Sequence, residues 1–388
     1  MQITRLSIDN WRNFKHLDIA VSPRLIVVGP NASGKSNFLD VFRFLGELVE
    51  PGGGLAAAVE KRGGIGKIRS LFARNHRGGR AEIKVWLDDD GVEWEYFLSM
   101  RGEGKGRNRA FVAKETVAKD GVLILDRPSP EDLADPERLT QTHLEQISAN
   151  IDFRPIYQRF GQTTYLHLVP QIIRDPRRAT DVTNDPFGGD FIAQMNAVNS
   201  RTRSAWLKRM QKALQAAVPQ FESLDIVVDS SGRPHLKAGY KNWRSTLANQ
   251  TEADFSDGTL RLIGLLWALV KIPANGGTLL LEEPELSLSS EVVRVLPTVL
   301  AQAQRSKDAQ IILTSHAPEL IDDEGVSPSE VLVLTVTDDG STGFILDERS
   351  DLVADIDDGI PASDVIRPFI SPENLSEISK VSFSGGRL

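Results

Sequence analysis

A glycine-rich loop lies between two apolar segments near the amino terminus, where residues 24–45 read RLIVVGPNASGKSNFLDVFRFL. Residues 25–28 are mostly β-branched, as in a buried parallel strand, and residues 37–45 space their apolar side chains as a helix does. Between them, residues 29–36 fit G-x-x-x-x-G-K-[ST] in the strand-loop-helix context that a phosphate-binding loop requires. The sequence therefore predicts an α/β fold that binds a nucleotide at this loop.

Each residue type in this loop has a chemical reason. Glycines let the backbone wrap closely around a polyphosphate, and the backbone amides and the helix N-terminus supply a fixed positive dipole. Lys35 is expected to reach the β- and γ-phosphates, and the Ser36 hydroxyl is expected to bind Mg²⁺. We expect a nucleotide to contact the run Asn31, Ala32, Ser33, Gly34, Lys35, Ser36 and Asn37.

Composition limits the class of protein. A chain of 388 residues with 40% hydrophobic content can fill one large α/β domain or two ordinary ones. There is no cysteine, which excludes disulfides and thiolate zinc sites and favours a reducing cytosol. The amino terminus alternates apolar and polar residues, and no apolar run approaches the roughly 18 residues of a membrane span. We therefore expect a cytoplasmic protein with no membrane partner.

Two adjacent acids end a second apolar strand, in residues 276–290, which read GGTLLLEEPELSLSS. The strand Thr278–Leu281 would deliver Glu282 and Glu283 into the space beside the phosphates. One carboxylate can hold the metal while the other polarises the attacking water. The alternative is a pair of surface acids, but the apolar strand before them favours an interior position.

A third apolar strand, Ile311–Leu313, ends in Thr314, Ser315 and His316. A single histidine at a strand end is more often structural than catalytic. Here it completes a series of three strands with polar ends, as expected when a ligand lies at the carboxyl ends of a parallel sheet. His316 is therefore predicted to donate a hydrogen bond to the γ-phosphate.

Small polar residues also precede the most apolar helix of the chain, in residues 254–270, which read DFSDGTLRLIGLLWALV. Ser256 or Asp257 is a suitable helix N-cap, because its side-chain oxygen can accept a bond from an amide of the first turn. That interpretation gives no role to Gly258.

These four motifs, in this order and at these separations, resemble the ABC-type ATPase heads of the RecF, SMC and OLD group. The chain is most similar to the compact bacterial ATPases that lack a long coiled coil. Its opening residues resemble their amino-terminal strand hairpin, so the resemblance spans nearly the whole chain. It implies a P-loop NTPase with a mixed central sheet flanked by helices, plus an amino-terminal antiparallel β subdomain.

The resemblance also implies roles for particular residues. In such heads Ser256, Asp257 and Gly258 form a signature that caps the γ-phosphate held by a second copy, so that a homodimer encloses two ATP molecules. The implied catalytic residues are Glu283 and His316, and the implied metal-side residues are Ser36 and Glu282. Arg12 is implied to contact nucleotide.

Three departures from the common pattern bear on hydrolysis rate more than on binding. Glu282 stands where Asp is usual, and the loop after the acids reads LSLSS. The glutamine that usually follows the outer strand is not evident, and Gln171, after an expected strand Thr164–Leu168, is the candidate.

We expect a single head over residues 1–388 with four parts. Residues 1–100 form a nucleotide lobe, residues 100–220 a helical or irregular insertion with one helix over 188–218, residues 220–346 a lobe with the signature, the acidic pair and His316, and residues 347–388 an acidic tail.

Charge suggests partners. The net charge is −8, but residues 319–358 hold thirteen acids against Arg349 alone, so the rest is mildly basic. Basic clusters occur at residues 61–80 and 101–109. The leading hypothesis is an ATP-gated dimer that controls a separately encoded effector, such as a nuclease, in bacterial defence against phage. The alternative is a RecF-like repair ATPase whose basic clusters clamp DNA directly.

Two further alternatives are disfavoured. The nucleotide subunit of a membrane transporter would be shorter and would carry the signature LSGGQ. A metal nuclease would need a four-acid site from Asp338, Asp339, Asp347 and Glu348, but too little chain follows His316 for such a fold, and a solvated acidic face is the simpler interpretation.

Overall fold

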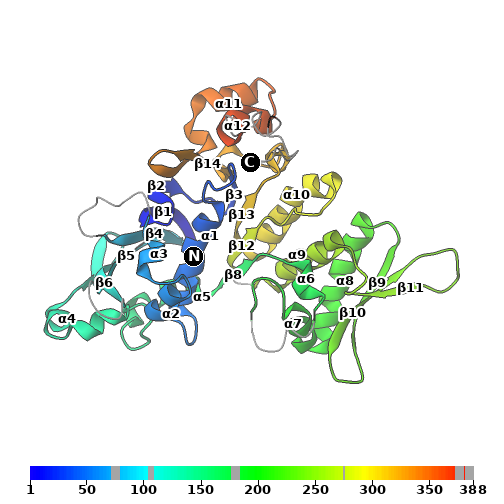
Figure 1. The fold of residues 1–388 in the computed structure, drawn as a ribbon, viewed down its shortest axis with the longest axis horizontal. Helices are drawn as coiled ribbons and strands as arrows, with labels where there is room; N and C mark the ends of the chain where they lie inside the picture. Colours follow the sequence, from blue (N-terminus) through cyan, green and yellow to red (C-terminus); the bar gives the residue numbers. More distant parts are fainter. Residues whose placement is uncertain (71–78, 104–108, 176–183, 274–275, 372–379, 381–388) are drawn as a thin grey trace, which may run out of the picture.

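Twelve strands form one large sheet within the part of the chain that the structure describes (Figure 1). The structure is a computed structural model, and it describes residues 1–70, 79–103, 109–175, 184–273, 276–371 and 380. In the order in which they lie side by side, the strands are β7 (Val122–Arg127), β6 (Ala110–Lys119), β5 (Val92–Gly102), β4 (Ala81–Asp89), β1 (Gln2–Trp11), β2 (Phe14–Ala20), β15 (Gly340–Ile345), β14 (Val331–Thr337), β3 (Arg24–Val28), β13 (Ala309–Ser315), β12 (Gly277–Glu282) and β8 (Thr163–Leu166).

The sheet has an antiparallel half and a parallel half. From β7 to β2 every neighbouring pair is antiparallel. From β14 to β8 every neighbouring pair is parallel. Strand β15 joins the halves, because it is parallel to β2 and antiparallel to β14. This mixed sheet confirms the predicted fold class, with the antiparallel β subdomain as one half.

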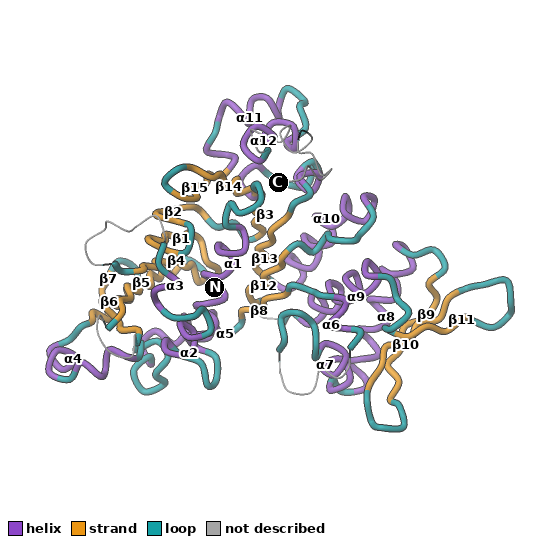
Figure 2. Tube along the Cα trace, in the orientation of Figure 1, coloured by secondary structure: helices purple, strands orange, loops and turns teal. Residues whose placement is uncertain are grey.

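Helices cover both faces of the parallel half, and Figure 2 shows them on either side of the strands. Leu25 and Val27 of β3 face a core shared with α1 (Lys35–Val49). Ile26 and Val28 face a second core, shared with α9 (Asp257–Lys271), α10 (Ser290–Lys307) and α12 (Ala362–Ile370). Parallel strands need this double coverage, which explains why residues 25–28 of β3 are all apolar and all buried.

A third hydrophobic core lies beyond the β8 edge of the sheet, in the part drawn in green in Figure 1. It joins α7 (Phe191–Ala197) and α8 (Ser200–Ala217) to a small antiparallel sheet of β9 (Phe221–Val228), β10 (Pro234–Tyr240) and β11 (Ala248–Thr251). Helix α9 belongs to both cores, since Leu265 packs in the second and Leu262 in the third. Helix α9 therefore connects this part to the large sheet.

The remaining described elements are short. They are α2 (Leu55–Glu60), α3 (Ile65–Ile68), α4 (Pro130–Ala134), η2 (Pro136–Thr140), η3 (Ile151–Phe153), α5 (Arg154–Gly161), α6 (Pro170–Ile173), η4 (Pro318–Ile321), η5 (Pro328–Glu330), η6 (Leu346–Glu348) and α11 (Ser350–Asp357).

The antiparallel half extends beyond the expected limit near residue 100. Asp120 and Gly121 have φ values of 49° and 77°, so they form a tight hairpin turn that lets β7 continue the sheet from β6. Strand β8 also lies inside the expected insertion, residues 100–220, yet it pairs with β12 in the parallel half. The expected insertion thus contributes three strands to the large sheet.

One further expectation differs from the structure. The helix expected over 188–218 is divided, because Val198 is extended and the Asn199 side chain accepts a 3.0 Å bond from the Thr202 amide to begin α8. The acidic tail, residues 347–388, begins with two helices, and Ile366 of α12 is fully buried. Residues 372–379 and 381–388 of that tail lie outside the described residues.

Candidate functional site

The glycine-rich loop occupies the turn between β3 and α1. Two of its residues have left-handed backbone, Ala32 with φ 64° and Gly34 with φ 96°. A Cβ atom at Gly34 would also clash with the side-chain amide of Asn13, which donates to the Ala32 carbonyl at 3.5 Å. Glycine is therefore favoured at position 34 by its positive φ, and a larger residue there would also displace the Asn13 side chain.

Lys35 lies largely inside this loop. Its Nζ donates to the carbonyl oxygens of Gly29 at 2.7 Å and Pro30 at 3.1 Å. Burial lowers the pKa of Lys35, and three nearby carboxylates oppose that shift, namely Glu283, Glu285 and Glu282. A cation held by neutral carbonyls beside carboxylates is well placed to exchange those partners for an anionic phosphate.

Ser33 adds a second polar group inside the loop. Its hydroxyl is fully buried and has no hydrogen-bond partner among the described residues. Because an unpaired buried hydroxyl is costly, a bound phosphate oxygen is a suitable partner for it.

The Glu282 carboxylate joins two elements at the end of β12. Its Oε1 accepts a hydrogen bond from the Ser36 hydroxyl on α1, and its Oε2 accepts one from the Tyr165 hydroxyl on β8. Burial, followed by the bond to Glu282, raises the pKa of Tyr165 far above that of free tyrosine, so the phenol stays a donor. Ser36 and Glu282 thus place oxygen atoms of the kind that Mg²⁺ prefers side by side.

Glu283 follows with a left-handed backbone, φ 47°, which is rare for a non-glycine residue and typical of functional sites. Its amide donates to the Thr314 carbonyl at 3.1 Å, which fixes this turn to the end of β13. Its Oε1 lies 3.0 Å from Nε2 of His316. The left-handed backbone at Glu283 interrupts the alternation of a strand, which explains how two consecutive carboxylates lie at the same edge of the sheet.

Glu285 holds the segment that carries His316. Its buried Oε1 accepts hydrogen bonds from the Ser315 hydroxyl at 2.6 Å and from the His316 amide at 2.9 Å. The three acids of the EEPE segment therefore have separate contacts, and sequence reasoning did not single out Glu285.

The signature segment begins α9. Ser256 is its N-cap, and the Ser256 Oγ accepts a bond from the Thr259 amide at 3.1 Å. Asp257 pairs with Arg174 at 2.6 Å and accepts a 3.3 Å bond from the Gln171 amide group. Gln171, the candidate for the expected glutamine, therefore contacts the signature rather than the acidic pair.

The structure explains why position 258 is a glycine, which the sequence did not reveal. A Cβ atom there would clash with the carbonyl oxygen of Ser287, in the loop after the acidic pair. The start of α9 and the LSLSS loop therefore touch backbone to backbone.

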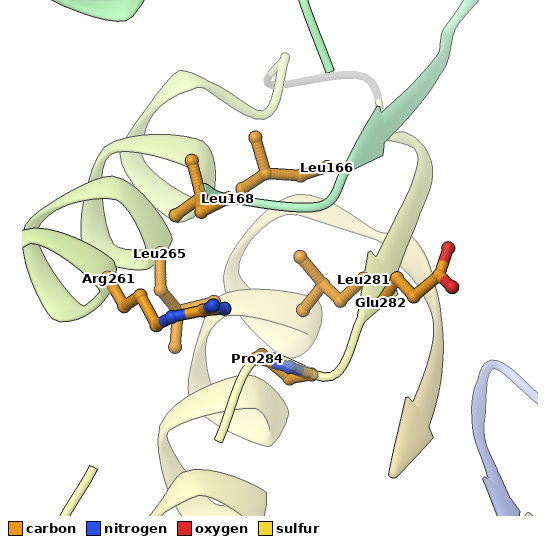
Figure 3. A pocket seen from close by; sticks show the side chains of 7 residues that line it. All are labelled: Leu166, Leu168, Arg261, Leu265, Leu281, Glu282 and Pro284. Atoms are coloured by element: carbon orange, nitrogen blue, oxygen red, sulfur yellow. The ribbon is translucent and has the colours of Figure 1, made fainter. Parts of the chain in front are cut away.

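Arg261, one turn into α9, also approaches this loop. Figure 3 shows its side chain directed toward the end of β12 between Leu265 and Pro284, while the Glu282 carboxylate points away from this small apolar pocket. Burial lowers the pKa of Arg261, and nearby carboxylates, including that of Glu283, oppose the shift. The signature helix thus carries a cation close to the acidic pair.

The remaining expected nucleotide contacts lie around the loop. The Arg12 guanidinium lies 3.3 Å from the Asp40 carboxylate on α1 and donates to the Lys67 carbonyl at 3.4 Å. Asn37 donates to the Asn13 side chain at 2.8 Å. Asn31 is exposed, and it lines a pocket with His316 and with Ile370 of α12.

Tyr165 and His167 approach the site but were not predicted. His167 Nδ1 lies 3.8 Å from Oε2 of Glu282 and is buried without a hydrogen bond among the described residues. The sequence signal that could have identified them is their spacing, because residues two apart near the end of one strand share a face. That signal becomes useful only once β8 is known to lie beside β12.

Some of the described cations in the two basic clusters are paired with acids of the same chain. Arg62 is buried and ion-paired with Asp40 at 2.7 Å and with Glu47. Arg109 pairs with Glu103 and Glu137, each at 2.7 Å. Residues 71–78 of the first cluster and 104–108 of the second lie outside the described residues.

The four acids of the metal-nuclease alternative are divided between two places. Asp338 and Asp339 occupy the turn that precedes β15, and Asp347 and Glu348 follow the other end of the same strand. No group of three or more metal-ligating side chains occurs among the described residues. The structure does not support this alternative.

Comparison with known proteins is consistent with this geometry. Residues 25–322 match the family model described as "AAA domain, putative AbiEii toxin, Type IV TA system". No curated protein sequence gives a significant match. In the helices that are described, none is long and apolar enough to cross a membrane.

Two solved structures are similar in fold. One is an Smc head bound to the C-winged helix domain of ScpA, with a TM-score of 0.56, 16% identity, and coverage of 90% of this chain and 99% of that chain. The other is an Smc head with an extended coiled coil bound to the C-terminal domain of ScpA derived from Pyrococcus furiosus, with a TM-score of 0.50, 16% identity, and coverage of 92% and 99%. These matches show that the chain shares the fold of Smc heads, in agreement with the predicted resemblance.

Proposed function

Because the chain belongs to the family described as "AAA domain, putative AbiEii toxin, Type IV TA system", we propose that it is a Mg²⁺-dependent ATPase. Two copies enclose two ATP molecules, and the closed homodimer gates a separately encoded effector protein such as a nuclease. The protein would act in the bacterial cytoplasm, in defence against phage.

The observation that carries the ATPase proposal is a convergence of polar side chains at one edge of the sheet. Three adjacent parallel strands, β3, β13 and β12, end there. Ligands of open α/β sheets bind at the carboxyl ends of such strands. The side chains that meet at this edge are Lys35, Ser36, Glu282, Glu283 and His316.

The residues of the loop suit a polyphosphate and a divalent cation. Lys35 and the buried Ser33 hydroxyl supply donors for phosphate oxygens. Lys35 would give up its bonds to loop carbonyls, whereas the Ser33 hydroxyl has no hydrogen-bond partner among the described residues to give up. Ser36 and Glu282 supply oxygen ligands for Mg²⁺. When bound, Mg²⁺ neutralises charge on the β- and γ-phosphates.

The acidic pair divides the work of hydrolysis. Glu282 serves the metal, because it already contacts the Ser36 hydroxyl. Glu283 accepts the proton of the attacking water, and His316 donates a hydrogen bond to a γ-phosphate oxygen. Glu285 supports this step by holding the His316 backbone in place.

The signature suits a contact with a second copy. Ser256 Oγ accepts a bond from the Thr259 amide, and a serine hydroxyl can still donate its own proton to a phosphate oxygen. The N-terminus of α9 adds its dipole to the same contact. A two-fold arrangement would give each phosphate loop one signature from its partner.

One observation is against a DNA contact made by Arg62 and Arg109, and a protein effector does not need that contact. Arg62 and Arg109, from the two basic clusters, already satisfy carboxylates within the chain. A cation committed to an internal ion pair contributes little to a phosphate contact. The Smc heads of similar fold are described as bound to domains of ScpA, which shows that a head of this fold can hold a second protein.

The test measures ATP-dependent dimerisation. A Glu283→Gln protein should double its mass in light scattering when ATP and Mg²⁺ are added. Adding Ser256→Arg should abolish that change and leave binding of a fluorescent ATP analogue intact. The matched control is Asn199→Arg, which removes another N-cap, that of α8.

Mixing two inactive proteins gives a sharper result. A Ser256→Arg subunit and a Lys35→Ala subunit form one composite site with both changes and one with neither, so partial ATPase activity should return. If the mass of the Glu283→Gln protein does not change with ATP and Ser256→Arg has no effect, the segment serves only as a helix cap.

A further inference from the structure

Tyr165 holds the carboxylate that the proposed function assigns to the metal. Its hydroxyl donates to Oε2 of Glu282, while the Ser36 hydroxyl donates to Oε1 of the same group. Both oxygens of one carboxylate are therefore fixed, from two different elements of the fold.

The sheet register explains why Tyr165 reaches this position. Tyr165 on β8 pairs with Leu280 on β12, and paired residues of neighbouring strands point to the same face. Glu282 lies two residues beyond Leu280, hence on that face as well. Tyr165 is the nearest β8 side chain of that face, and its ring packs against the core of α1.

The tyrosine ring is itself held in place. The Arg43 guanidinium of α1 lies 5.1 Å from the ring centroid, within the range of a cation–π contact. Tyr165 is half-buried between this cation and the sheet. Its hydroxyl therefore has a defined position relative to both α1 and β12.

The chemistry of the metal site creates a need for this contact. A glutamate has one more rotatable bond than an aspartate, so its carboxylate has more orientations to lose. A Ser36 hydroxyl that binds Mg²⁺ through its oxygen can still donate its proton to Oε1, so Ser36 and the cation would both lie at that side of Glu282. Tyr165 donates a hydrogen bond to the other oxygen, Oε2, and so holds the carboxylate at the oxygen that does not face Ser36.

We propose that Tyr165 is a positioning residue that holds Oε2 of Glu282 so that Oε1 faces the cation. This inference rests on the proposed function, because it assigns Glu282 to the metal. Residues that hydrogen-bond to metal ligands commonly change metal affinity about 10- to 100-fold when they are removed.

The experiment separates cation binding from nucleotide binding. Mn²⁺ replaces Mg²⁺ as the probe, and its affinity for the protein with ATP is measured by electron paramagnetic resonance in the Glu283→Gln background, where turnover is slow. Tyr165→Phe should weaken Mn²⁺ about 10-fold or more. Binding of a fluorescent ATP analogue in EDTA should stay unchanged.

Two further variants exclude a merely structural role. Tyr157→Phe is the matched control, since Tyr157 on α5 packs against the same core and should leave Mn²⁺ affinity unchanged. Glu282→Asp shortens the carboxylate out of reach of Tyr165, so Tyr165→Phe should add no further loss there. The ring of Tyr165→Phe keeps its contact with Arg43, so the melting temperature should stay close to that of the parent protein.

The outcomes separate this inference from the proposed function. Equal Mn²⁺ affinity in the parent and Tyr165→Phe proteins would overturn the positioning role and leave the ATPase proposal standing. The same loss in the Glu282→Asp background would also overturn it, because the effect would not pass through Glu282. A parent protein that binds neither ATP nor Mn²⁺ would refute the proposed function, and the inference with it.

Discussion

Nε2 of His316 lies 3.0 Å from Oε1 of Glu283, which joins the histidine that follows β13 to the acid that follows β12. The two strands are parallel neighbours, so both side chains leave the same edge of the sheet. On the proposed mechanism, the imidazole turns from this carboxylate to the γ-phosphate and frees Glu283 for the attacking water. The pair would thus separate before each turnover.

Replacing Glu283 tests that assignment. Glu283→Gln should bind ATP and Mg²⁺ but hydrolyse ATP about 10² to 10⁴ times more slowly, the usual loss when a general base is removed. Phosphate release at saturating ATP measures the rate. If Glu282→Gln gives this phenotype and Glu283→Gln is active, the two acids have exchanged roles.

Removing the loop cation should abolish nucleotide binding. Lys35→Ala leaves the β- and γ-phosphates without their closest compensating charge, so affinity for ATP should fall below detection in calorimetry. Lys208→Ala, on the exposed face of α8, is the control for loss of a lysine elsewhere. Parent-like affinity in Lys35→Ala would contradict the site.

Gly258→Ala should destabilise the protein. The added Cβ meets the Ser287 carbonyl, and overpacking of this kind costs about 1–3 kcal/mol. Gly66→Ala is the control, because a Cβ there meets nothing within 4 Å, and the free energy of unfolding should stay the same or rise slightly. Equal stability of the two variants in urea would show that the LSLSS loop moves freely.

His235 should make stability depend on pH. Its Nδ1 lies 2.5 Å from Glu252 and its Nε2 lies 3.3 Å from Asp229, and the hydrogen bonds to these acids raise its pKa above the usual value. A raised pKa in the folded state means that folding favours the protonated ring. The contribution of His235 to the free energy of unfolding is therefore complete below the pKa of the unfolded state, about 6.5. It is lost as pH rises through the pKa of the folded state.

The free energy of unfolding of His235→Gln, subtracted from that of the parent protein, measures this term. We expect the difference to be larger at about pH 5.5 than at about pH 9. A difference that is flat, or that grows with pH, would show that the imidazole is not held as an ion pair.

The phosphate-loop unit of the parallel half could be predicted because its signals are local. The strand β3, the loop and α1 follow one another within residues 24–49, and chemistry dictates the residue types there. The hairpin of β6 and β7 was predictable too, since Asp120 and Gly121 are typical turn residues between two segments rich in β-branched and other apolar residues, but it was missed. Its strands belong to the antiparallel half.

The contacts that were not predictable depend on pairing between distant segments. Tyr165 meets Glu282 because β8 adds to the sheet beside β12, although the two residues are far apart in the chain. Position 258 has room only for glycine because the Ser287 carbonyl lies close to it, and no local pattern reveals that contact. Register and backbone approach are tertiary properties, and a single sequence does not display them.

The place of β3 in the sheet also governs how the chain can fold during synthesis. This strand is made among the first thirty residues, yet its two neighbours, β13 and β14, are made after residue 308. Until then both edges of β3 lack partners, and such late, long-range pairing slows folding and leaves strand edges open to aggregation. A nascent chain that stops before residue 309 would carry every residue of the phosphate loop and still be unable to build the strand that presents it.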